Sequence, residues 1–213
     1  MKTIAVFGGS GGLGSQLVPY LEESEQYNVI SISSSDVDIT NSDMVNEFFI
    51  NNDIDIVINL AGYNFDSLVH KLTNQVEINK MIDINIKGNI NILASSLPHM
   101  RTKNYGRVIL ISSVLSDKVV FGTSLYSACK GFIDNMVKRA SLENISKGVT
   151  CNSIQLGYFD GGMCHRIPSE YKEKIKNSIG LKRWGSIKEL HDTIDYLINT
   201  EYISGQNVNI SGG

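Results

Sequence analysis

The chain has 213 residues, of which 42% are hydrophobic and 19% are charged, and its formal net charge is −3. This length is sufficient for one α/β domain with a full core, and the composition is that of a globular protein. A small negative charge without a Lys/Arg cluster argues against binding to nucleic acids or anionic membranes. The three cysteines and four histidines show no metal-ligand spacing, so we expect no metal site.

The cellular compartment of the protein can be predicted from its apolar runs and its cysteines. No apolar run is long enough to span a membrane. The first apolar run, residues 4–7, is too short for a signal peptide, and glycines follow it at once. The odd number of cysteines favours reduced thiols over a disulfide framework. We therefore expect a cytoplasmic protein.

The first predicted elements are a buried strand at residues 2–7, a glycine-rich turn and a helix over residues 15–23. Together they form the first half of a βαβ unit that binds a dinucleotide. Gly8 permits the tight turn, Gly12 lets a pyrophosphate approach the backbone, and Gly14 lets the helix pack on the strand. A flexible glycine loop is the alternative, but the position between a strand and a helix argues against it.

The second predicted strand, residues 28–33, is followed by an unusually short connection. Only Ser34 to Asp36 separate it from the position of the next strand, and a helix begins near Asn41. A parallel crossover needs about a dozen residues. We therefore predict no full strand between Asp36 and Thr40, and a sheet of six parallel strands with the second strand at its edge.

Later strands end in polar residues. A strand over residues 55–62 contains Asn59, and a strand over residues 107–113 ends at Ser113. Ligands of open α/β sheets gather at the carboxyl ends of the strands. The alternation of strands and helices predicts an α/β fold, a doubly wound parallel sheet of the Rossmann type, in a single domain over residues 1–213.

Four polar side chains carry the predicted chemistry. Tyr126 and Lys130 lie four residues apart on one face of a helix, and Asn85 lies in the helix over residues 79–97. In carbonyl reduction Tyr126 would donate a proton, Ser113 would orient the substrate oxygen, and Lys130 would lower the Tyr126 pKa and hold the nicotinamide ribose. The structural alternatives are a strand-end cap for Ser113 and a satisfied helix amide for Asn85.

These motifs together resemble the short-chain dehydrogenase/reductase family. The matching positions are the glycine pattern Gly8, Gly12 and Gly14, the segment Asn59-Leu60-Ala61-Gly62, and the order and spacing of Asn85, Ser113, Tyr126 and Lys130. Residues 183–190 and 204–213 resemble the 3-oxoacyl-acyl-carrier-protein reductase branch of that family. The chain departs from the family pattern at Phe7, at Leu156-Gly157 and in residues 159–163, which bears on nicotinamide binding.

The resemblance implies further roles. Asn85 would hold a water that links Lys130 to solvent, and residues 157–185 would form a substrate lid. The chain would form a homodimer or homotetramer, and a helix over residues 79–97 with apolar residues on several faces agrees with this. The expected cofactor-binding residues are Gly8, Ser10, Gly11, Gly12, Leu13, Gly14, Ser33, Ser34, Asp38, Ile39, Asn59, Ala61, Gly62, Tyr126, Lys130 and Gly157.

The choice of cofactor rests on the end of the second strand. An acidic residue there would hold the adenosine ribose and repel a 2′-phosphate. Ser33, Ser34 and Ser35 occupy this place and can donate to a phosphate. No Arg or Lys is adjacent, Gly11 stands where many NADP-dependent relatives carry a basic residue, and Asp36 lies close by. The serines favour NADP(H) over NAD(H).

The substrate is less well determined. Apolar lid residues favour a 3-oxoacyl thioester or a small ketone; these residues are Tyr158, Phe159, Met163 and Ile167. Arg166, Lys172 and Lys174 would meet an acidic carrier or form a solvated helix face. A sugar nucleotide or another polyol is the alternative substrate. A non-catalytic dinucleotide sensor is the alternative of another class, against which the intact proton donor Tyr126 argues.

Overall fold

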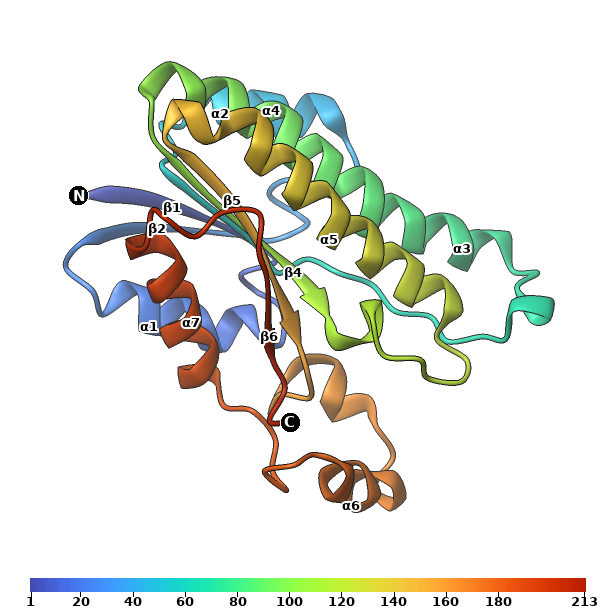
Figure 1. The fold of residues 1–213 in the computed structure, drawn as a ribbon. Helices are drawn as coiled ribbons and strands as arrows, with labels where there is room; N and C mark the ends of the chain where they lie inside the picture. Colours follow the sequence, from blue (N-terminus) through green and yellow to red (C-terminus); the bar gives the residue numbers. More distant parts are fainter.

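The computed structural model describes residues 1–213, except for the side chains of Met163 and Arg166. Six parallel strands form one sheet in the order β2-β1-β3-β4-β5-β6 (Figure 1). The strands are β1 (Lys2–Phe7), β2 (Tyr27–Ile32), β3 (Ile56–Asn59), β4 (Gly106–Ser113), β5 (Val149–Leu156) and β6 (Asn207–Ile210). The predicted α/β fold is confirmed, with β2 as the edge strand.

Helices cover both faces of this sheet (Figure 1). One face packs against α2 (Ser42–Asn51), α4 (Gly88–Lys103) and α5 (Ser124–Asn144). The other face packs against α1 (Gly14–Glu22) and α7 (Ile187–Asn199). Because both faces are covered, the central strands read as nearly continuous apolar runs, and residues 4–7 of β1 are fully buried.

The short connection after β2 has the predicted form. Residues 33–40 form turns, in which the Asp36 and Val37 N–H groups both donate to the Ser33 carbonyl oxygen at 3.2 and 3.1 Å. Val37 and Ile39 are buried, so this segment closes the core without a strand of its own. α2 then begins after Asn41, whose side-chain oxygen accepts from the N–H groups of Asp43 and Met44.

The helix predicted over residues 79–97 is longer and is interrupted. It begins as α3 (Gln75–Ile82), passes through a π-helical turn η2 (Asp83–Lys87) and continues as α4 to Lys103. Such π turns are rare and often occur at functional sites. Here the turn contains Asn85, which is fully buried.

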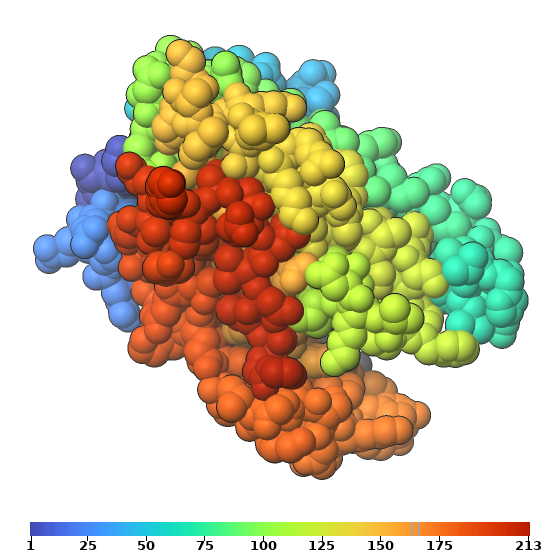
Figure 2. Space-filling model, viewed as in Figure 1, coloured from blue at the N-terminus to red at the C-terminus, as the bar shows by residue number. Residues whose placement is uncertain are grey.

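The segment between β5 and α7 lies beyond the carboxyl ends of the strands. It contains a 3-10 turn η5 (Gly162–Arg166) and α6 (Ser169–Ser178). In Figure 2 this orange segment stands out from the rest of the surface as a separate lobe. The side chains of Met163 and Arg166, for which roles in this segment were predicted, lie outside the described residues.

Candidate active site

The glycine-rich turn between β1 and α1 forms the floor of a cleft of about 490 Å³. Gly8 has a φ of 75°, and a Cβ there would lie 2.8 Å from the backbone nitrogen of Ala61, so only glycine fits. α1 begins without a side-chain cap. The Ser15 and Gln16 N–H groups donate to the carbonyl oxygens of Gly11 and Leu13, whereas Gly12, Leu13 and Gly14 line the cleft at the start of the helix. This arrangement is suited to binding a pyrophosphate.

Most of the predicted cofactor-binding residues line this cleft. They are Gly8, Ser10, Gly11, Gly12, Leu13, Gly14, Ser33, Ser34, Asp38, Ile39, Ala61 and Gly62. Asn59 does not line it and is only 1% exposed. Its side chain accepts from the Ala61 N–H at 3.0 Å and donates to the Asn89 side-chain oxygen at 2.9 Å. Asn59 therefore acts on the cleft by holding the turn after β3.

Gly12 has a second reason to be glycine that the sequence did not show. A Cβ on Gly12 would lie 2.5 Å from the Cα of Gly162, in the segment after β5. The Gln16 side chain donates to the carbonyl oxygens of Gly12 and Asp160 at 2.9 and 3.4 Å, which ties the same two segments together. The base of the predicted lid therefore packs directly on the glycine-rich turn.

A second pocket, of about 360 Å³, adjoins the cleft. Ser113, Tyr126, Lys130 and Gly157 line this pocket. Four residues line both the cleft and the pocket, which are therefore continuous; these are Leu13, Leu60, Gly62 and Asn64.

Tyr126 is buried beside Ser113. Burial raises the pKa of Tyr126 to about 12, and a hydrogen bond from Ser113 opposes this shift in part. The direction is opposite to the predicted lowering by Lys130. The reason is geometric: the Lys130 Nζ lies 5.5 Å from the centre of the Tyr126 ring and donates to the Ile111 carbonyl oxygen at 2.8 Å.

Lys130 is itself almost fully buried, on the face of α5 that packs against β4 and β5. Burial lowers the pKa of Lys130 to about 8, while the nearby Cys129 and Asp134 side chains raise it. The ammonium group therefore depends on its surroundings to remain charged.

Asn85 lines neither the cleft nor the pocket. Its side-chain oxygen accepts from the Tyr63 N–H at 3.2 Å, and its amide donates to the carbonyl oxygens of Tyr63 and Met81 at 2.7 and 3.0 Å. Asn85 thus fixes the backbone just after Gly62, where the cleft and the pocket meet. The predicted water relay through Asn85 stays a prediction.

Two residues that line the pocket were missed by the sequence analysis. None of the described hydrogen bonds involves the Asn64 side chain, and its buried oxygen has no partner. Asp66 lines the pocket, and its charge raises the pKa of both Tyr126 and Tyr158. Their position just after the strand-end segment that ends at Gly62 was the only available signal.

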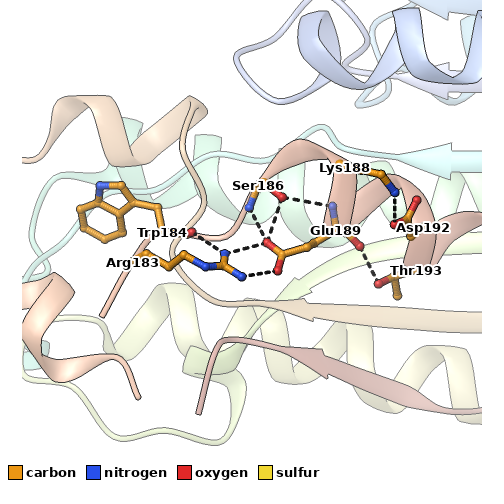
Figure 3. Close-up of polar contacts among 7 residues, drawn as sticks. All are labelled: Arg183, Trp184, Ser186, Lys188, Glu189, Asp192 and Thr193. Carbon is orange, nitrogen blue, oxygen red and sulfur yellow. Dashed lines mark hydrogen bonds and ion pairs between the residues drawn. The ribbon is translucent and has the colours of Figure 1, made fainter. Parts of the chain in front are cut away.

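An ion pair holds the far end of the predicted lid (Figure 3). The Arg183 guanidinium donates to both oxygens of the Glu189 carboxylate at 2.9 and 2.6 Å. These bonds, together with those from Ser186, lower the Glu189 pKa to about 2. Ser186 and Glu189 also form a capping box at the start of α7. Arg183, in the segment between β5 and α7, is therefore tied to the first turn of α7.

Within the described residues, no group of three His, Cys, Asp or Glu side chains is arranged to hold a metal ion. Among the helices of the described chain, none is both long enough and apolar enough to cross a membrane.

Comparisons with known proteins agree with this geometry. The family model described as short chain dehydrogenase matches residues 32–172. The 3-oxoacyl-(acyl-carrier-protein) reductase FabG of Staphylococcus aureus is 30% identical over 162 residues, which span 75% of this chain but only 65% of that protein. The enzyme of the same name from Rickettsia prowazekii is 27% identical over 232 residues, with 100% of this chain and 96% of that protein covered.

Two solved structures show the same fold. ElxO with NADP bound has a TM-score of 0.89 at 21% identity, and the alignment covers 100% of this chain and 98% of that one. NAD⁺-bound xylitol dehydrogenase has a TM-score of 0.89 at 22% identity with 100% and 98% coverage.

Proposed function

Because the chain belongs to the short-chain dehydrogenase family, we propose that it is an NAD(P)(H)-dependent oxidoreductase acting on a carbonyl or alcohol substrate. One observation carries the proposal: the dinucleotide cleft and the pocket of Ser113 and Tyr126 are continuous. The residues fit a dinucleotide, since a Cβ at Gly8 or Gly14 would collide with backbone atoms of the turn or its neighbours. The nicotinamide, when bound, supplies or accepts the hydride.

The protein side chains would handle the proton. At neutral pH Tyr126 is a neutral phenol, since its pKa is about 12, and so it can donate a proton to the oxygen of a reduced carbonyl. Ser113 would bond to the same oxygen and orient it. Lys130 would hold the ribose hydroxyls and stabilise the Tyr126 phenolate left after proton transfer. Asn85 would act through the Tyr63 backbone that it fixes.

The preferred substrate is a 3-oxoacyl thioester or a small ketone. The pocket supports this choice with a largely apolar lining that includes Leu115, Val120, Phe121, Ile167 and Ile175. The named relatives act on acyl-carrier-protein substrates, and this chain would take a carrier-borne or free substrate of that chemistry. Residues 157–185 would close over it as a lid within a single domain.

A second substrate class is favoured by one observation. The unpaired Asn64 side chain and the Asp66 carboxylate both line the pocket. An amide and a carboxylate offer acceptors for hydroxyl groups. The buried Asn64 oxygen, which has no partner among the described atoms, would be satisfied by a ligand that supplies a donor, and the exposed Asp66 carboxylate could accept a second hydroxyl. A hydroxylated ketone, as in a sugar or polyol, would use both residues, whereas a plain ketone would use neither.

The hydrogen bonds between Ser33 and Asp36, at the end of β2, bear on the choice between NAD(H) and NADP(H). The Ser33 hydroxyl, expected to donate to a 2′-phosphate, instead donates to the Asp36 carboxylate at 2.6 Å, and the Ser33 N–H donates to the same oxygen at 2.8 Å. These bonds lower the Asp36 pKa. A fixed negative charge at the end of β2 would repel a 2′-phosphate. We therefore propose that NAD(H) is preferred over NADP(H), although the serines alone favour the reverse.

A carbonyl panel read by NADH and NADPH absorbance tests these proposals. The panel pairs methyl ketones with their hydroxylated analogues and includes 3-oxoacyl thioesters. Oxidation of NADH by the wild-type protein and its loss in Tyr126→Phe are expected. No turnover with any carbonyl, despite measurable cofactor binding, would favour the non-catalytic sensor instead. Clearly tighter binding of NADPH than NADH would contradict the proposed role of Asp36.

A further inference from the structure

A buried polar cluster lies next to Lys130 and outside the pocket. Asp134 follows Lys130 by one helical turn on α5 and is 4% exposed. Its Oδ1 accepts from the Ser153 hydroxyl at 2.7 Å, and its Oδ2 accepts from the Gln155 amide at 2.8 Å. The same Gln155 nitrogen donates to Asp117 at 2.7 Å. Asp134 is thus held rigidly by two neutral donors from β5.

These two donors supply hydrogen bonds but no opposite charge. A carboxylate removed from water is costly unless a cation balances it. Among the described ion pairs none involves Asp134, and the next cation along the helix, Lys138, lies beside Asn207. Lys130 is the complementary case: a buried ammonium whose only described hydrogen bond goes to a neutral carbonyl. The Asp134 carboxylate thus needs a positive charge nearby, and the Lys130 ammonium needs a negative one.

The titratable side chains near Lys130 come from α5 itself and from the elements that pack against it. Two side chains raise the Lys130 pKa against the lowering by burial, Cys129 when it is a thiolate and Asp134 when it is a carboxylate. The Cys129 thiol is neutral near pH 7 because burial raises its pKa. The other titratable groups are Tyr126 on α5, Cys151 on β5, Asp117 after η3, the mutually paired Asp83 and Lys87 in η2, and Asp66 and Cys164 across the pocket.

We propose that Asp134 is a positioning residue whose buried carboxylate, held in place by Ser153 and Gln155, keeps Lys130 in its ammonium form. The proposal rests on the proposed role of Lys130, since a neutral amine would neither stabilise the Tyr126 phenolate nor bind the ribose as strongly. Residues four apart on a helix lie about 6 Å apart between Cβ atoms. For neighbouring groups on one helix face at an effective dielectric of about 20, loss of the charge should shift the Lys130 titration to lower pH by on the order of one unit.

The test replaces the charge and keeps the shape. In Asp134→Asn an acceptor for Gln155 remains while the negative charge is lost. The titration of Lys130 is followed through its Cε resonance in ¹³C-lysine-labelled protein, assigned by its absence in Lys130→Met. We expect the midpoint to fall by on the order of one pH unit, and the alkaline limb of the kcat profile to move with it. Asp134→Glu, which keeps the charge, should retain most of the wild-type midpoint.

A matched control is available in the same cluster. Asp117→Asn makes the same chemical change at the other carboxylate bonded to Gln155, which is less buried and does not act on Lys130. It should leave the Lys130 midpoint unchanged. Should Asp134→Asn fail to fold, Asp134→Ser takes its place with the same measurement.

The outcomes separate the two proposals. A folded neutral variant at position 134 with a wild-type Lys130 midpoint would overturn the role of Asp134. An equal shift in Asp117→Asn would also overturn it, because the effect would then be general to the cluster. Absence of any reductase activity would count against the proposed function, but the Lys130 resonance would still decide the role of Asp134.

Discussion

Removal of the Ser113 hydroxyl should lower kcat much more than it lowers the folding stability. The Ser113 Oγ accepts from the Leu115 N–H at 3.2 Å, which caps the short turn η3 (Val114–Ser116), and it also bonds to Tyr126. Loss of such a cap costs about 1 kcal/mol of folding stability. Loss of one bond to the substrate oxygen in the transition state costs roughly 10²–10³ in kcat, or about 2.7–4 kcal/mol. The effect on turnover should therefore far exceed the effect on folding.

Ser96 provides the control for Ser113→Ala. It is a fully buried serine on α4 whose hydroxyl has no hydrogen-bond partner among the described atoms. Ser96→Ala should leave kcat unchanged and should not lower the free energy of unfolding, because an unpaired buried hydroxyl is lost. Both variants would be measured by steady-state kinetics with the best carbonyl of the panel and by urea unfolding. A Ser113→Ala protein with kcat within threefold of wild type would refute the assigned role.

Three further outcomes are expected. Tyr126→Phe should lose about 10²-fold or more in kcat while its dissociation constant for the cofactor, measured by fluorescence, stays nearly the same; equal turnover would contradict proton donation by Tyr126. Light scattering at micromolar concentration should give a dimer or tetramer, and a monomer would count against the predicted homo-oligomer. The pair with Arg183 lowers the pKa of Glu189 from its ordinary value of 4.5 to about 2 in the folded protein. The pair therefore stabilises the fold fully above pH 4.5, and this stabilisation is lost as the pH falls towards 2. The difference in Tm between wild type and Glu189→Gln should therefore be constant near neutral pH and shrink between about pH 5 and pH 2; an unchanged difference at pH 2 would exclude that pair as its source.

The shortened sheet could be predicted because chain length limits connectivity. Ser34 to Asp36 are too few residues for a parallel crossover, whatever the rest of the chain does. The glycine-rich turn was predictable for a similar reason, since its constraints act over a few neighbouring residues. The main residues of the candidate site followed as well, because parallel strands bring their carboxyl ends to one edge. The resemblance to the family supported the same residues through their order and spacing along the chain.

The helix around Asn85 was only partly predictable. Its apolar periodicity located it, but the π-helical turn and the earlier start at Gln75 did not follow from the sequence pattern. A π turn costs local hydrogen-bond geometry and persists when surrounding contacts compensate for it. Here Asn85 bonds to the Tyr63 backbone, 22 residues away in the chain. That contact exists only once β3 and the helix have packed together.

The chemistry of the site was decided by tertiary structure. Spacing places Tyr126 and Lys130 on one helix face, but it does not say that Lys130 donates to Ile111 or that burial raises the Tyr126 pKa to about 12. The sequence likewise could not show that Ser33 bonds to Asp36, or that Asp134 bonds to Ser153 and Gln155 of β5. Local pattern determines which residues share a face. Desolvation and hydrogen-bond partners depend on what the assembled sheet and helices put against that face, and these set the pKa of each group.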